Sequence, residues 1–208
     1  STGAEAFLLE PQSTNLITQS ELFSDTSWTK SGSSVVSGFV SPDGTANAFK
    51  LVEDTSTGTH LTQVRISSAS TNPHTLSFYA KANTRNRVTI TNWNNSTQYA
   101  GATFDLINGI VVGTILGSAK IETMSNGWYK CSIIGTPPST SLGYQQIAIG
   151  SNTASGFGLS SYTGDGTSGV YIYGAQLEQQ SYATSYIPTS GASATRNQEL
   201  CNNATPVI

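Results

Sequence analysis

Short segments of alternating apolar and polar residues, each ended by turn-forming residues, recur along this chain. In PHTLSFYAKA (73–82), Leu76 and Phe78 point to one side of an extended strand, while Ser77 and Tyr79 point to the other. No segment of useful length has the helical period, and the regular spacing predicts about ten or eleven short strands. The sequence therefore predicts an all-β fold, a two-sheet antiparallel jelly-roll-like β-sandwich. The expected strands are 35–40, 46–53, 61–66, 73–82, 87–93, 99–106, 110–112, 120–124, 128–134, 144–150 and 170–177.

The last expected strand is followed by an aromatic segment that ends the pattern. Tyr182 and Tyr186 precede Pro188, which removes a backbone donor and opposes further strand pairing. This predicts a single β-sandwich domain over 1–190 and a polar C-terminal extension, or a linker to a further domain, over 191–208. Strict alternation over the last strand predicts one face of Val170, Ile172, Gly174 and Gln176 and another of Tyr171, Tyr173, Ala175 and Leu177.

Few residues are charged, and this narrows the classes of partner. Charged residues make up 10% of the 208 residues, and the net charge is −3. Nucleic-acid binding needs clustered lysine and arginine, so we expect no nucleic-acid partner. No apolar segment approaches the roughly 20 residues that span a bilayer, and no signal peptide is visible, so we expect no membrane insertion.

The two cysteines and two histidines give no metal signature. Cys131 lies in a strand pattern and Cys201 in the polar C-terminal segment. A buried free thiol at Cys131 is favoured over a disulfide between the two, since free cysteine behaves as a small hydrophobic residue. His60 and His74 stand in separate segments, and no Cys-x-x-Cys is present, so a zinc site is not expected.

Several segments together resemble a known family. They are LLEPQSTNLI, SPDGTANAFKLVED, HTLSFYAKA, ATFDLINGIV, NGWYKCSI and GDGTSGVYIYGAQLEQQSYATSYIPTSGASATR, in that order. They resemble the carbohydrate-binding-module-like β-sandwich domain of bacteriophage tail, fibre and capsid-associated proteins, which is related to modules of bacterial polysaccharide-degrading enzymes. The resemblance covers residues 7–196, and its most specific part is AQLEQ…ATSYIPT…ATR. It implies a jelly-roll sandwich, non-catalytic sugar binding, and a virion or extracellular location.

A sugar-binding sheet needs aromatic rings that stack on a pyranose and polar groups that bond its hydroxyls. Strands 73–82 and 87–93 are expected to place Tyr79, Lys81 and Trp93 on one sheet face, with Trp93 as the first choice for stacking. The alternative, that these aromatics cap the core or are covered, has equal weight for Trp93 and more weight for the others. The candidate carbohydrate-binding residues are Trp93, Tyr79, Lys81, Asn94, Tyr99, Trp128, Tyr144 and Gln146.

A structural calcium ion is the one cofactor considered. Asp43, Asp54 and Asp165 lie in or beside turns and could supply carboxylate oxygens. The alternative, that they are solvated acids of the turns, is the stronger interpretation. No EF-hand spacing is present.

No catalytic residues are singled out, and the domain is expected not to be an enzyme. Gly-x-Ser-x-Gly is absent, and no carboxylate pair stands in strand phase with aromatics. The leading hypothesis is a glycan- or receptor-binding domain of a phage virion protein, with a polysaccharide or cell-surface glycan as partner. One alternative is a structural module that attaches or oligomerises a virion fibre or tail protein, with other virion proteins or itself as partner. Another is a polysaccharide-targeting module appended to a bacterial glycoside hydrolase or lyase.

Overall fold

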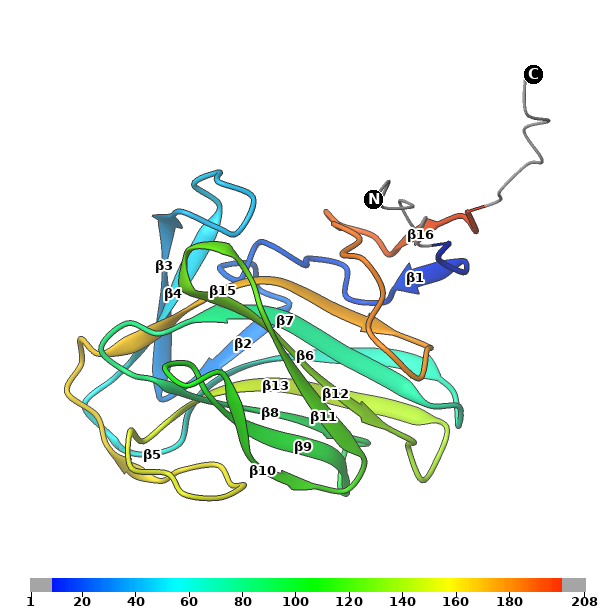
Figure 1. The fold of residues 1–208 in the computed structure, drawn as a ribbon. Coiled ribbons are helices and arrows are strands. Elements are labelled where there is room, and N and C mark those ends of the chain that lie inside the picture. Colours follow the sequence, from blue (N-terminus) through cyan, green and yellow to red (C-terminus); the bar gives the residue numbers. More distant parts are fainter. Residues whose placement is uncertain (1–8, 200–208) are drawn as a thin grey trace, which may run out of the picture.

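Two six-stranded antiparallel sheets pack face to face in the computed structural model, which describes residues 9–199 (Figure 1). The first, here called the Trp93 sheet, has the strand order β10 (Ile110–Ile115), β9 (Gln98–Asp105), β8 (Arg87–Trp93), β13 (Ser141–Gly150), β6 (His60–Ala69), β2 (Trp28–Ser31). The second, the Tyr79 sheet, has the order β11 (Ser118–Thr123), β12 (Trp128–Gly135), β7 (His74–Lys81), β15 (Gly169–Glu178), β4 (Ala48–Glu53), β3 (Ser33–Phe39). This is the sandwich that the alternating segments predict.

Two small strand pairs complete the fold. β1 (Ser13–Asn15) pairs with β16 (Ala194–Arg196), and β5 (Thr57–Gly58) pairs with β14 (Tyr162–Thr163). β16 belongs to the segment expected to be an extension, while the boundary near residue 190 stays a prediction. Within residues 9–199 the one helical segment is the three-residue η1 (Ser125–Gly127), and no helix there is long and apolar enough to cross a membrane.

Consecutive strands β7 and β8 belong to different sheets. Phe78 of β7 and Ile90 of β8 are fully buried and face each other's sheet across the core. The outward-facing residues of the two strands, Tyr79 and Trp93 among them, therefore point to opposite outer faces. The expected single face of Tyr79, Lys81 and Trp93 is wrong, because alternation fixes the phase of a strand but not its neighbours.

A bulge changes the phase of β15. Its pairing with β7 shifts between Tyr173 and Gln176, and Gly174 has a φ of 60°, in the left-handed region open to glycine. As a result, Leu177 joins Ile172 in the core, while Tyr173 and Gln176 lie on the outer side. The strict alternation predicted for this strand is therefore wrong beyond Tyr173.

The aromatic segment after β15, residues 179–193, is here called the strap. It lies over the outer side of the Tyr79 sheet, and Tyr186 packs its ring against Tyr79 and Tyr173. Asn15 Nδ2 donates to the Ile187 carbonyl at 2.9 Å, which ties the strap to the N-terminal part of the chain. The strap thereby closes the outer side of the Tyr79 sheet.

Cys131 is a free thiol buried in the core, with none of its surface exposed. Burial raises the pKa of this thiol, since the apolar core disfavours the thiolate. Cys201, its possible disulfide partner, lies outside the described residues.

Candidate functional site

Two rows of side chains cross the outer face of the Trp93 sheet. Tyr144 of β13 is the direct partner of Trp93 on β8 and of Arg65 on β6, so these three side chains form one row. Direct antiparallel partners point to the same side of a sheet, which fixes this arrangement. Gln146 is likewise partnered by Thr91 and Gln63 and forms the second row. We call the six residues the platform: Gln63, Arg65, Thr91, Trp93, Tyr144 and Gln146.

A chain of hydrogen bonds fixes the platform. The Trp93 indole N–H donates to Thr91 Oγ1 at 3.0 Å, and the Thr91 hydroxyl donates to Gln146 Oε1 at 2.8 Å. Gln146 Nε2 then donates to Gln63 Oε1 at 2.7 Å. These bonds hold the edge of the indole ring against the sheet. Gln63 is the last residue in this series of hydrogen bonds, and its amide N–H₂ can donate to a ligand.

Trp93, Tyr144, Gln63 and Gln146 are partly exposed, and Arg65 is exposed. The Arg65 guanidinium carbon lies 5.9 Å from the centre of the Tyr144 ring, within the range of a cation–π contact. An arginine stacked on a tyrosine holds both side chains in a narrow range of orientations. The platform thus presents two rings and several amide and guanidinium donors on a fixed surface.

A long loop, residues 151–161, covers the neighbouring part of this sheet. The Thr89 hydroxyl donates to the Gly158 carbonyl at 3.2 Å, which anchors the loop over β8 and β9. The Phe157 ring lies directly on Gly101 of β9, where a Cβ would come within 2.6 Å of the ring. Glycine at this position lets the ring approach the sheet. Gly101 is the cross-strand partner of Thr91, so the loop borders the platform on its β9 side. The loop is drawn in yellow in Figure 1.

The sequence identified three members of the platform among its candidates, namely Trp93, Tyr144 and Gln146. It did not single out Gln63 and Arg65. Alternation in the segment LTQVRI indicates that Gln63 and Arg65 share one face of β6. The sequence does not show that β6 lies beside β13, and the platform depends on this pairing.

Asn94 lies next to the platform and stabilises a turn. Its Nδ2 donates to Ser139 Oγ at 3.0 Å, and its Oδ1 accepts the Thr97 N–H at 2.9 Å. The side chain therefore joins the β8–β9 turn to the segment between β12 and β13. It is available to a ligand only at the border of the platform.

Tyr79 and Trp128 lie on the other outer face, in a buried cluster with Tyr173 against which Tyr186 of the strap packs. Trp128 is 1% exposed and Tyr79 is 9% exposed. Burial raises the pKa of Tyr79, with a smaller contribution from Glu122. Neither ring is open for stacking on a sugar, and Lys81, the direct partner of Trp128, is likewise separated from the platform.

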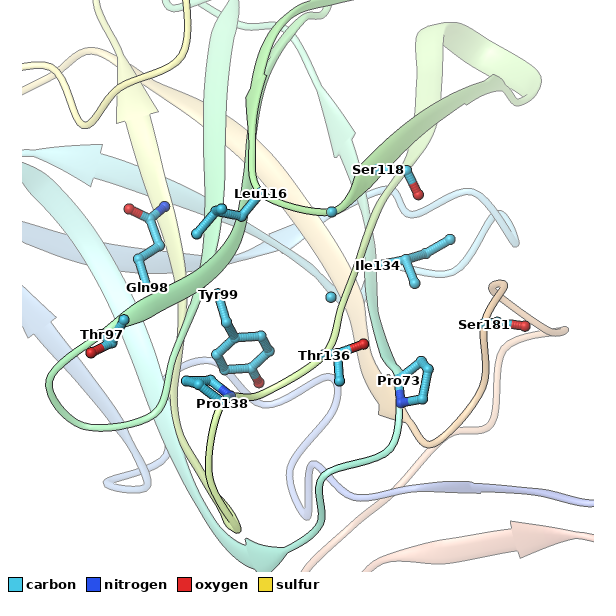
Figure 2. A pocket seen from close by; sticks show the side chains of 12 residues that line it. Pro73, Thr97, Gln98, Tyr99, Leu116, Ser118, Ile134, Thr136, Pro138 and Ser181 are labelled. Atoms are coloured by element: carbon cyan, nitrogen blue, oxygen red, sulfur yellow. The ribbon is translucent and has the colours of Figure 1, made fainter.

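Tyr99 lines a pocket of about 560 Å³ at one end of the sandwich. Figure 2 shows its ring directed toward Pro138 and Thr136, while the amide of Gln98 points away from them. Burial raises the pKa of Tyr99 to about 12, although the Gln145 side chain lowers it slightly. Gln98 is the cross-strand partner of Trp93, so the pocket lies beside the platform but Tyr99 faces the inner side.

The three aspartates considered for calcium act in turns. Asp43 Oδ1 accepts the Thr45 N–H at 2.9 Å, Asp54 Oδ1 accepts the Ser56 N–H at 2.9 Å, and Asp165 Oδ1 accepts the Thr167 N–H at 2.8 Å. Among residues 9–199, no three histidine, cysteine, aspartate or glutamate side chains form a group that could hold a metal ion. A structural calcium ion stays a prediction.

Comparison with known proteins gives several similar structures, among them two phage proteins. No family model matches the chain, and no curated protein matches it in sequence. The enzymatically active domain of tailspike protein 4 from bacteriophage CBA120 aligns with a TM-score of 0.49 and 15% identity, over 78% of this chain and 21% of that one. A conserved carbohydrate esterase from the Shiga toxin-encoding bacteriophage phi24B aligns with a TM-score of 0.40 and 11% identity, over 80% of this chain and 97% of that one.

Both similar structures are phage proteins, and this chain spans about a fifth of the tailspike domain. Each is described as an enzyme, which contradicts the expectation that a domain of this kind is not an enzyme, and that expectation is not retained. With TM-scores of 0.49 and 0.40, the likeness assigns no activity to this chain. The finer resemblance to carbohydrate-binding modules stays a prediction.

Proposed function

We propose that the platform binds a carbohydrate chain. The observation that carries the proposal is the cross-strand pair of Trp93 and Tyr144, partly exposed beside a row of amide side chains. Two rings next to each other on one face can stack on successive pyranose rings. The Gln63 amide and the Arg65 guanidinium lie where they can donate to the sugar hydroxyls.

The proposed setting is a phage virion protein that carries this domain to a polysaccharide or cell-surface glycan. The family resemblance of the sequence supports this setting. The same platform would also serve a domain that directs a bacterial polysaccharide-degrading enzyme to its substrate. In both settings the domain binds the polysaccharide at its surface.

The test is a glycan array followed by titration of the glycans that bind. Trp93→Ala and Tyr144→Ala are each expected to weaken binding by roughly tenfold or more, because each removes a stacking surface. Tyr182→Ala is the matched control, since Tyr182 is 48% exposed but lies on the strap. Binding that is unchanged in both platform variants, or the absence of binding to any glycan, would refute the proposal.

A second candidate function is self-association through the edge strand β10. Ile110 and Ile115 are 52% and 41% exposed, and the following Leu116 is 58% exposed. The strand IVVGTI contains no charged residue or proline, which are the usual features that keep an edge strand from pairing.

Sedimentation velocity tests self-association. We expect an oligomer that Ile115→Lys converts to monomer, because a charge on an edge strand opposes edge-to-edge pairing. Lys substitution at Val36, which is 50% exposed on the opposite sheet, is the control. A monomer at all concentrations would exclude this second function and leave glycan binding untouched.

A further inference from the structure

We infer that the platform selects an anionic polysaccharide, whose carboxylate or other oxyanion binds Arg65. This inference rests on the proposed function, since it names the class of glycan that the same surface would take. It depends on three features of Arg65: its lack of an ion-pair partner, its place in the aromatic row, and the charge of its surroundings.

Arg65 differs from the other three arginines of the chain. Arg85 pairs with Glu53 at 2.6 Å, Arg87 with Asp105 at 2.8 Å, and Arg196 with Glu10 at 2.7 Å. Within residues 9–199 no carboxylate lies at ion-pair distance from Arg65. Its guanidinium N–H groups are therefore available to bind an anion of a ligand.

The contacts of Arg65 orient its guanidinium group but leave most of its N–H donors without an acceptor in the described part of the chain. Its guanidinium carbon lies over the Tyr144 ring, and Nη2 is 3.5 Å from Asn95 Oδ1, which is a long hydrogen bond. A guanidinium is planar and offers parallel N–H donors, so it matches the two oxygens of a carboxylate. Stacking on tyrosine reduces the side-chain entropy lost when the anion binds.

The row Trp93, Tyr144, Arg65 runs across the strands. Adjacent strands are about 4.8 Å apart, so Arg65 lies roughly 10 Å from Trp93, measured between backbones. A glycan that stacks on the two rings would place the next sugar at the guanidinium. An acidic substituent on that sugar would thus meet a cation at the end of the aromatic surface.

The net charge of the whole chain indicates that an acidic glycan would be recognised by a single cationic side chain and not by overall electrostatic attraction. The net charge of −3 does not attract a polyanion, so any preference for an acidic glycan must come from a particular cation. One ion pair at an exposed site is weakened by salt. We therefore expect a modest decrease in affinity for the acidic glycan as salt increases, and none for a neutral one.

The experiment compares three oligosaccharide probes by equilibrium titration of the full chain. The probes are an oligogalacturonate, its neutral methyl ester, and a sulfated galactan of similar length. The wild-type protein is expected to bind the oligogalacturonate more tightly than the ester. Comparable binding of the sulfated galactan would show that Arg65 accepts any oxyanion, and weaker binding would show that it selects a carboxylate.

The variants distinguish the inference from the function on which it rests. Arg65→Gln is expected to reduce the acidic-to-neutral affinity ratio by roughly tenfold or more, because a charged hydrogen-bonded pair is lost. Arg65→Lys should retain part of the ratio, since it keeps the charge but loses the fork. Trp93→Ala should weaken binding of acidic and ester probes alike, and Lys120→Gln, a charge change on the other sheet, should leave the ratio unchanged.

A ratio that does not change in Arg65→Gln, or a wild-type preference for the ester, would overturn the inference and leave carbohydrate binding standing. Failure of the wild-type protein to bind any glycan, acidic or neutral, would overturn both.

Discussion

Tyr79 and Trp93 lie on opposite outer faces of the sandwich, Tyr79 beneath the strap and Trp93 partly exposed. The strap contributes Tyr186 to the covered side, where it packs edge-on against Tyr79 with ring centres 6.0 Å apart. One outer face is thus part of the folded interior, and the other is available to a ligand. Substitutions on the two faces should accordingly have different consequences.

Removal of a tryptophan should destabilise the protein much more on the covered face than on the open one. Trp128→Ala is expected to lower the free energy of unfolding by about 3–5 kcal/mol, because it leaves a cavity in the buried cluster of Tyr79 and Tyr173. Trp93→Ala should lower it by about 1 kcal/mol or less, as at most surface positions. Chemical denaturation followed by circular dichroism measures both, and equal losses would contradict the assignment of the two faces.

The ion pair of Arg85 and Glu53 should be important for stability. The Glu53 carboxylate is fully buried and accepts two hydrogen bonds from the Arg85 fork, at 2.8 and 2.6 Å. Arg85→Gln leaves this buried charge without its cation and is expected to cost about 3–5 kcal/mol.

Lys120→Gln is the control for that measurement. It breaks the exposed pair of Lys120 and Glu122, and exposed pairs contribute about 1 kcal/mol or less. Denaturant unfolding at neutral pH gives both values. Similar losses in the two variants would show that the Glu53 carboxylate gains nothing particular from Arg85.

Stability should decrease in acid because of carboxylates held in turns. The Ser41 hydroxyl bond, with smaller contributions from Thr45 and Tyr173, lowers the pKa of Asp43 to about 2, although partial burial opposes this. Hydrogen bonds from Ser168 and Thr167 likewise lower the pKa of Asp165. A lowered folded-state pKa stabilises the fold above the ordinary value of about 4, and this contribution is lost as the pH falls toward 2.

The measurement is the melting temperature between pH 7 and pH 2. We expect it to be nearly constant down to about pH 4 and to fall below that. Asp43→Asn should flatten the acid side of the curve, since the amide does not titrate. A melting temperature that rises in acid would contradict the direction of these pKa shifts.

The bulge in β15 should tolerate no side chain at Gly174. Alanine there would adopt a φ of 60° and bring its Cβ to 3.1 Å from the Tyr79 ring and 3.2 Å from the Tyr186 ring. Gly174→Ala is expected to cost about 1–3 kcal/mol in the free energy of unfolding.

Gly191→Ala is a matched control for the bulge. Its φ is 86°, and a Cβ would meet nothing within 4 Å, so it carries the backbone strain without the steric contact. Thermal unfolding of the two variants separates the contributions. Equal melting temperatures would mean that the rings of Tyr79 and Tyr186 yield freely.

Alternation in the sequence was sufficient to predict β7, β8 and the class of fold, because each strand carries its own pattern of buried and outward residues. It was insufficient for the site, because the platform depends on which strands are neighbours. Arg65 becomes a candidate only when β6 is known to lie beside β13. The bulge at Gly174 was equally invisible, since a glycine in a strand pattern indicates a close approach or a bulge without saying which.

The pairing of β1 with β16 has a mechanical consequence. Ser13 is opposite Arg196, so the chain enters and leaves this short ladder at the same end. Tension applied to the two ends of the described segment would open the ladder as a zipper, one residue pair after another, starting at the Glu10 and Arg196 ion pair. This short ladder would open before the two larger sheets were strained, so the platform would keep its geometry under such tension.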